Sequence, residues 1–259
     1  MGRFEWKASL RVLALLLTAF MVAGTVLQLV LQLNLTGSPP EPKDVVTDDI
    51  MANFAFEYGR WPMDFASQVL FALGFAALAG VGILLSRLAD YLDTRRALTS
   101  ALFVGAGILG VAASLVWIGV APVATFPHYC PCDLRDAQLA ARVTVLDVSS
   151  SVSVWLTNGA MVLASIGFVL VVQLARAAGM SRGWALITYL TVAASLLAIV
   201  LGSLSITPSE DIPLAPYIAL AVAGILIPIW ALWLAIRAPA LAGPDDVAAD
   251  PALDSGLPG

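Results

Sequence analysis

The sequence has too few charged residues to cover a water-exposed surface of its size. Only 12% of the 259 residues are charged, whereas about 25% is usual for a soluble domain. Apolar residues make up 60% of the chain, and the mean hydropathy is +0.91. Most of the chain is therefore expected to be surrounded by lipid rather than by water.

Groups that many enzymes and nucleic-acid-binding proteins need are also scarce. The chain has one histidine, which excludes a haem held by two histidines, and it has no P-loop, zincin or G-x-S-x-G motif. A net charge of -5 without a basic patch argues against nucleic acid as a partner. No Asp, Glu, Lys, Arg or His falls at mid-membrane in the helices placed below, which disfavours a proton-coupled pump or transporter.

Six apolar runs are each long enough to cross a bilayer core of about 30 Å, which takes roughly 20 helical residues. They lie near Leu10–Leu33, Phe65–Leu85, Ala97–Val120, Val152–Leu174, Ala185–Leu204 and Leu214–Ile236. The first run is too long for a signal peptide and lacks a clean A-x-A site, so it is interpreted as a retained helix. The predicted fold class is all-α: a polytopic integral membrane protein with a six-helix transmembrane bundle over residues 1–237.

The basic residues predict the orientation. One set of loops holds nine Lys and Arg and the other holds four, so the positive-inside rule places the first set, with both termini, in the cytoplasm. The acidic, proline-containing residues 238–259 are then a cytoplasmic tail, which we expect to be disordered. Eleven arginines against two lysines, with abundant alanine, indicate a GC-rich prokaryote, hence its plasma (inner) membrane.

Two outer loops, about residues 34–64 and 121–151, are long. In the first, apolar residues recur at helical spacing over residues 48–58, and polar, mostly acidic residues lie on the opposite face. Gly59 then offers a C-terminal stop. This pattern predicts a short amphipathic helix on the outer membrane surface. In the second, residues 136–151 are compatible with another helix, either separate or continuous with the fourth span.

The second outer loop contains the stretch HYCPCD, which holds the only histidine and both cysteines of the chain. Its candidate residues for a disulfide or a metal site are His128, Cys130, Cys132 and Asp133. Four interpretations remain open: a local disulfide, thiols that face a partner subunit, a zinc or Cu(I) site, and a thiol-redox pair. The one-residue spacing between the cysteines strains a disulfide and is too short for usual zinc sites. No cofactor other than zinc or copper is indicated.

Polar residues gather toward the outer third of several helices. The candidates are Gln28, Gln32, Asp64, Gln68, Asp147, Ser153 and Asn158. If they point inward, they line a polar vestibule open to the outside, which could hold a headgroup, a quinone ring or a small solute. The alternative is that they are ordinary wet helix ends, or amides that bridge helices at about 0.6 kcal/mol each.

Small residues recur at helical spacing in the third span, at Ala106, Gly110 and Ser114. Such a face allows close helix packing in lipid, and packing inside the bundle is the expectation rather than dimerisation. Pro228 in the sixth span predicts a local distortion of that helix.

Three functions fit these patterns. The leading hypothesis is a non-enzymatic accessory or structural subunit, whose partners are the lipid bilayer and other membrane subunits or a second copy of the chain. The alternative is a transporter or binder of a small polar or amphipathic molecule that uses the outer vestibule. The third is a metal- or thiol-redox protein centred on His128, Cys130 and Cys132.

Overall fold

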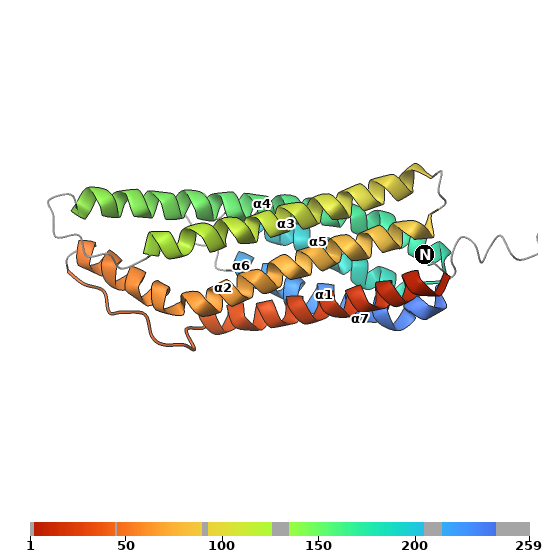
Figure 1. Cartoon of the computed structure of the whole chain (residues 1–259), viewed down its shortest axis with the longest axis horizontal. Helices are drawn as coiled ribbons and strands as arrows, with labels where there is room; N and C mark the ends of the chain where they lie inside the picture. The colour runs from red at the N-terminus through yellow and green to blue at the C-terminus, as the bar shows by residue number, and fades with distance from the viewer. Residues whose placement is uncertain (1–2, 45, 90–92, 126–134, 205–213, 242–259) are drawn as a thin grey trace, which may run out of the picture.

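The computed structural model of the chain describes residues 3–44, 46–89, 93–125, 135–204 and 214–241, and every regular element in these ranges is helical. The main helices are α1 (Arg3–Gln32), α2 (Val46–Leu85), α3 (Thr94–Thr125), α4 (Arg135–Ala177), α5 (Arg182–Leu204), α6 (Leu214–Ala221) and α7 (Ile227–Arg237) (Figure 1). A π-helical segment joins α6 to α7, so these two form one span. The predicted six-helix transmembrane bundle is thereby confirmed.

Neighbouring helices in the chain pack side by side. α2 lies between α1 and α3, α3 also packs on α4, and α5 packs on α4, while α7 returns to pack on α1. Successive spans run in opposite directions, so α1 begins and α7 ends at the same end of the bundle (Figure 1). We refer to this end as the terminal end. The opposite end, where α1 ends and where α2 and α4 begin, is the long-loop end.

α2 and α4 are much longer than a membrane crossing requires. With 40 and 43 residues they measure about 60 and 65 Å at 1.5 Å per residue, against about 30 Å for the hydrocarbon core. Figure 1 shows that both helices run past the end of α1 at the long-loop end. The helix considered for residues 136–151 is therefore the first part of α4, continuous with the fourth span.

The first long loop differs from the sequence-based expectation. Residues 48–58 do not form a separate surface helix, because they are the first turns of α2, which continues through Gly59 and Pro62. A proline inside a helix removes one backbone hydrogen bond and commonly kinks the helix without ending it. Figure 1 accordingly shows α2 changing direction within its long-loop half.

The sixth span is distorted just before Pro228, as its sequence predicts. α6 passes into the π-helical segment Val222–Leu226, and α7 begins at Ile227. Because Pro228 has no N–H, the carbonyl of Gly224 loses its α-helical partner, and a wider turn accommodates this loss. Gly224 also packs tightly on α1, since an added Cβ would lie 2.4 Å from Cγ2 of Thr25.

A cluster of aromatic side chains fills the terminal-end half of the bundle interior. The rings of Trp184 and Trp230 stack with centroids 5.6 Å apart, and Phe168 meets Trp230 edge-on at 4.8 Å. Phe103 completes the cluster at 5.4 Å from Phe168, and all four side chains are fully buried. A ligand inside the bundle would therefore have to occupy the other half.

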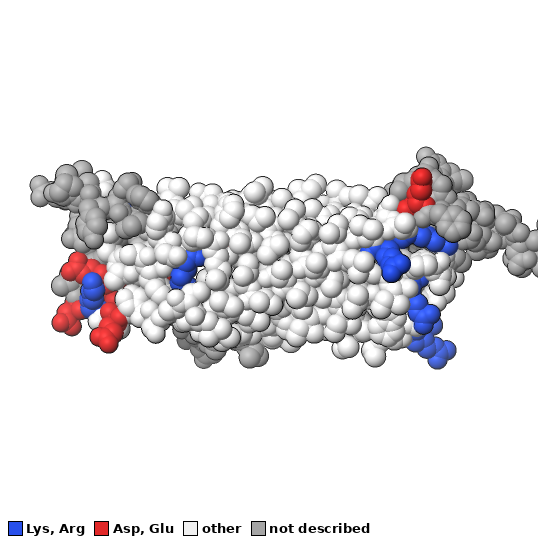
Figure 2. Space-filling model, turned by 60° about the horizontal axis from the view of Figure 1, so that its bottom comes forward, with Lys and Arg blue, Asp and Glu red and all other residues white. Residues whose placement is uncertain are grey.

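Charged side chains lie at the two ends of the molecule. On the face shown in Figure 2, basic side chains predominate at the terminal end and acidic ones at the long-loop end, with a wide uncharged belt between them. Six helices long and apolar enough to cross a bilayer run through this belt. The chain is therefore a multi-pass membrane protein.

Candidate functional site

The HYCPCD stretch cannot serve as the starting point for a site. His128, Cys130, Cys132 and Asp133 lie outside the described residues. Within the described ranges, no three His, Cys, Asp or Glu side chains gather as a metal site would require. The disulfide, metal and redox interpretations of this stretch stay predictions.

A cavity of about 290 Å³ lies inside the long-loop half of the bundle. Residues from all seven main helices and from the π-helical segment line it. Five of the seven vestibule candidates are among them: Gln28, Gln32, Gln68, Ser153 and Asn158. The structure thus brings together polar residues that are up to 130 positions apart in the sequence.

The cavity has a polar part and an apolar part. On α1, α2 and α4 the amide and hydroxyl side chains lie nearer the long-loop end than the apolar lining residues of the same helices, which are Met21, Phe71, Phe75 and Met161. Further hydroxyl groups come from Ser114, Thr157 and Ser195. None of the described lining residues is charged, so the cavity suits uncharged hydrogen-bonding groups attached to an apolar body.

The helical face of α1 that carries Thr18, Met21, Thr25, Gln28 and Gln32 is only partly directed at the cavity. Met21, Gln28 and Gln32 line it, as their common helical face requires. Thr25 is instead buried against Gly224 of the sixth span. Thr18 donates its hydroxyl hydrogen to the Ala14 carbonyl at 2.9 Å, within its own helix.

Several polar groups around the cavity are held in place by hydrogen bonds. Ser67 Oγ lies 2.9 Å from Gln28 Oε1 and 2.8 Å from the Asp64 carbonyl oxygen, so its hydroxyl ties α2 to α1. Ser153 donates to the Ala113 carbonyl at 3.1 Å and ties α4 to α3. These bonds join α1 to α2 and α3 to α4, the four helices of the cavity wall, and the amide side chains belong to this wall.

Two buried amide atoms of this wall have no hydrogen-bond partner among the described residues. They are the acceptor Oε1 of Gln32 and the donor Nδ2 of Asn158. An unpaired buried polar atom costs about 1–3 kcal/mol. A ligand that offers one donor and one acceptor would remove both costs.

A second cavity, of about 270 Å³, adjoins the first toward the long-loop end. Gln28 and Gln32 line both cavities. The second is lined in addition by charged and aromatic side chains, among them Asp64 and Trp117. Trp117 Nε1 donates to Asp64 Oδ2 at 2.5 Å, which orients the carboxyl group.

Arg60 holds the end of α1 against α2 beside this second cavity. Its guanidinium donates to the Leu31 carbonyl and, at 3.2 Å, to Asn34 Oδ1, and it pairs with Glu57 at 3.3 Å. It also lies 4.9 Å from the centre of the Phe56 ring. A cation at the C-terminus of a helix satisfies carbonyls that have no partner within the helix.

The two remaining vestibule candidates lie in different surroundings. Asp64 lines the second cavity, whereas Asp147 is exposed on α4 and lines neither. Sequence reasoning did not single out Arg60, Trp117 or Ser67 as site residues. Their contacts join different helices in ways that helical spacing cannot indicate.

Comparisons with known proteins found no matching family model, no matching curated protein and no matching solved structure. The geometry of the two cavities is therefore the basis for the function proposed next.

Proposed function

We propose that this protein binds a small amphipathic molecule between its helices, as a non-enzymatic receptor or transporter in the membrane. One observation carries the proposal: five polar residues, singled out in the sequences of three different helices, converge on one cavity. Residues that are merely tolerated at wet helix ends have no physical reason to converge. This favours the vestibule hypothesis over the subunit hypothesis that led on sequence alone.

The lining of the larger cavity indicates which part of the ligand it holds. Its amides and hydroxyls can both donate and accept hydrogen bonds, and the apolar residues beside them accept a hydrocarbon or ring. A volume of about 290 Å³ is near the lower end for ligand pockets, which usually measure about 300–1,000 Å³. The molecule is thus small, or only part of it enters the bundle.

We also propose that both termini lie in the cytoplasm and that the membrane is the plasma (inner) membrane of a prokaryote. The basic side chains at the terminal end (Figure 2) support this orientation. The arginine-rich, lysine-poor composition supports a prokaryotic source. In this orientation the two cavities belong to the outer half of the bundle, which suits a molecule that arrives from outside the cell.

The test asks whether the protein retains a small molecule from its own membrane. Nanodiscs formed directly from that membrane are analysed by native mass spectrometry, and released small molecules are identified. We expect a bound molecule on the wild type and its loss in Asn158→Leu, which removes the unpaired amide at similar volume. Thr144→Val, an exposed substitution on the same helix outside both cavities, should retain it.

A stability measurement separates ligand binding from a structural role of Asn158. Because Asn158 Nδ2 has no partner in the described chain, Asn158→Leu should unfold at the same temperature as the ligand-free wild type or above it. A wild type that carries no small molecule, or an Asn158→Leu variant that retains as much as the wild type, would contradict the proposed function.

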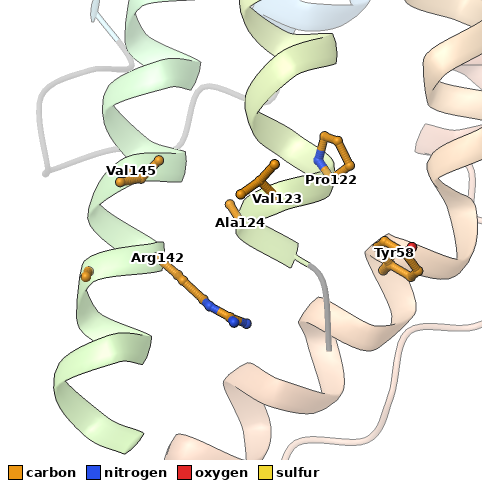
Figure 3. A pocket seen from close by; sticks show the side chains of 7 residues that line it. Tyr58, Pro122, Val123, Ala124, Arg142 and Val145 are labelled. Carbon is orange, nitrogen blue, oxygen red and sulfur yellow. The ribbon is translucent and has the colours of Figure 1, made fainter. Parts of the chain in front are cut away.

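A second candidate function, an accessory subunit in a membrane complex, has its own support. An open groove of about 640 Å³ lies at the long-loop end, lined by Tyr58, Pro122, Val123, Ala124, Ala141, Arg142 and Val145. Figure 3 shows Arg142 reaching from α4 across the space between α3 and α2, with Tyr58 on the opposite side. Because α2 and α4 project beyond a bilayer thickness here, an apolar groove at this place fits an apolar helical face of a partner subunit.

The subunit function is tested by crosslinking in the native membrane. A photo-crosslinking amino acid replaces Val145 in the groove or, as a control, the exposed Val200 of α5. We expect one heavier product of fixed mass from position 145 and none from position 200. No product, or a crosslink only to a second copy of this chain, would contradict an accessory-subunit role.

A further inference from the structure

We propose that the two cavities form one elongated site for an amphipathic amine, whose ammonium group lies at Asp64 and whose apolar body enters the larger cavity. The inference rests on the proposed function and adds the chemical class of the ligand. Gln28 and Gln32 line both cavities, so the two spaces share a wall and one chain-like molecule can occupy both.

Asp64 supplies the charge that an amine requires. The charged residues of the smaller cavity are Glu57, Arg60 and Asp64. Arg60 forms its ion pair with Glu57, and no Lys or Arg within the described chain forms one with Asp64. Arg60 also favours the Asp64 charge electrostatically, from beyond ion-pair distance. A partly buried carboxylate without a direct ion pair is still destabilised by lost hydration, and a bound ammonium offsets that loss.

Asp64 retains the capacity to bind a cation. Its carboxyl group accepts the Trp117 N–H and also interacts with the side chains of Gln68 and Ser67, whereas the two oxygens of a carboxylate can accept about four hydrogen bonds. Trp117 also lines the cavity. An indole ring beside the site favours an organic cation over an anion. Trp117 is therefore a positioning residue for the carboxyl group.

The unpaired amide atoms specify the ligand further. Gln32 Oε1 is a buried acceptor without a donor in the described chain, and Gln32 lies on the wall shared with Asp64. An ammonium that carries N–H groups can donate to Gln32 and Asp64 together, which a quaternary ammonium cannot. Asn158 Nδ2 is a donor in need of an acceptor, so the ligand carries an oxygen farther along its length.

The charge of the long-loop end agrees with a cationic ligand. Acidic side chains predominate there on the face shown in Figure 2. Glu41, Asp44 and Glu57, which belong to this end of the molecule, are exposed. A surface of one sign raises the local concentration of oppositely charged molecules and repels those of like charge. An anionic amphiphile would meet repulsion at this surface and again at Asp64.

The test uses three probes that share one scaffold and carry a positive, a neutral or a negative group at its end. Dansylcadaverine has an apolar ring, a sulfonamide with acceptor oxygens and a terminal primary ammonium. Its N-acetyl derivative is neutral and its N-succinyl derivative is anionic. Binding to the full chain in nanodiscs of neutral lipid is followed by energy transfer from tryptophan to the dansyl group, with empty nanodiscs as background and equilibrium dialysis as a second readout.

We expect dansylcadaverine to bind at least about tenfold more tightly than either derivative, as loss of a partly buried ion pair requires. Asp64→Asn should abolish this preference. Gln32→Leu should weaken the amine more than the neutral probe. Asp147→Asn, which removes an exposed charge on α4 that lines neither cavity, should leave the preference unchanged.

The results that differ from this expectation contradict either the amine class alone or the proposed function as well. Equal binding of the three probes, or a preference for the amine that survives Asp64→Asn in a variant with wild-type helicity and unfolding temperature, would overturn the amine proposal. If the neutral probe binds as tightly as the amine and is lost in Asn158→Leu, the proposed function stands and the amine class falls. If no probe binds while native mass spectrometry finds a retained molecule, the proposed function again stands and the amine class is again contradicted. If neither experiment finds a ligand, the proposed function and the amine class of the ligand are both contradicted.

Discussion

At the scale of single residues, the candidate site is built from neutral amides inside the bundle and from one carboxyl group at its edge. Amides such as Gln28 and Asn158 are far less costly within a membrane than charged groups. This difference explains why a polar cavity can exist in a chain with no ionisable residue at mid-membrane. Gln28 and Gln32 could be predicted because they share one helical face. Ser67 and Trp117 could not, because their roles arise from contacts between helices.

The close packing of α3 on α2 depends on glycine, which gives a prediction for stability. A Cβ added to Gly110 would lie 2.2 Å from the Phe75 ring, whereas nothing lies within 4 Å of a Cβ added to Gly119 on the same helix. We expect Gly110→Ala to lower the free energy of unfolding by about 1–3 kcal/mol through overpacking. Gly119→Ala, the matched control, should be neutral or stabilising because alanine favours the helix.

Thermal or denaturant unfolding of the two glycine variants in the same detergent measures this difference. The internal-packing interpretation of Ala106, Gly110 and Ser114 agrees with their burial. Equal stability of the Gly110→Ala and Gly119→Ala variants would show that Phe75 moves aside without cost. It would also remove glycine as the reason for the close approach of the two helices.

At the scale of elements, the start of α3 depends on one carboxylate outside the membrane. Asp93 Oδ1 accepts the Arg95 backbone N–H at 2.8 Å, and its Oδ2 pairs with the Arg95 side chain at 2.6 Å. These interactions hold the pKa of Asp93 below its usual value of 3.8, and the side-chain hydrogen bond with Arg95 contributes most to this. A lowered pKa means that the folded helix end prefers the ionised form.

The pH dependence of this helix start follows from the sign of the shift. Stabilisation by Asp93 is fully present above its unfolded pKa and is lost as the pH falls through the lower, folded pKa. We expect Asp93→Ala to speed hydrogen exchange of the first-turn amides of α3 at neutral pH. At a pH below the lowered, folded pKa of Asp93 the wild type and the variant should converge. Asp44→Ala, an exposed aspartate at the long-loop end, should not change these amides at either pH.

The extent of the elements was harder to predict than their existence. All six spans are present because long apolar runs have few alternatives in a bilayer. The sequence predicts a separate helix over residues 48–58 because Gly59 offers a stop, and Pro62 follows three residues later. In the structure the helix continues through both, and Phe54 in its first turns is buried. Such tertiary packing leaves no signal in the local sequence.

At the scale of the whole molecule, the acidic side chains and the extra length of two helices are found at the same end. The helices that exceed a bilayer thickness, α2 and α4, project at the acidic long-loop end (Figures 1 and 2). Both cavities and the groove are lined by residues of the same half of the molecule. The terminal end carries the aromatic cluster and most of the basic residues. One end is thus built for stability and anchoring, and the other offers the spaces where a ligand or partner fits.

The orientation of this asymmetric molecule decides from which side a ligand arrives, and it can be measured directly. The chain has only two cysteines, so a Cys130→Ser, Cys132→Ser background permits single-cysteine labelling. Ser38→Cys reports on the long-loop end and Ala177→Cys on the terminal end, and both positions are exposed. We expect a membrane-impermeant maleimide to label position 38 in intact cells and position 177 only after the membrane is opened, because the basic end stays in the cytoplasm. The reverse pattern would place the cavities toward the cytoplasm, and the ligand would then have to be a product of the cell.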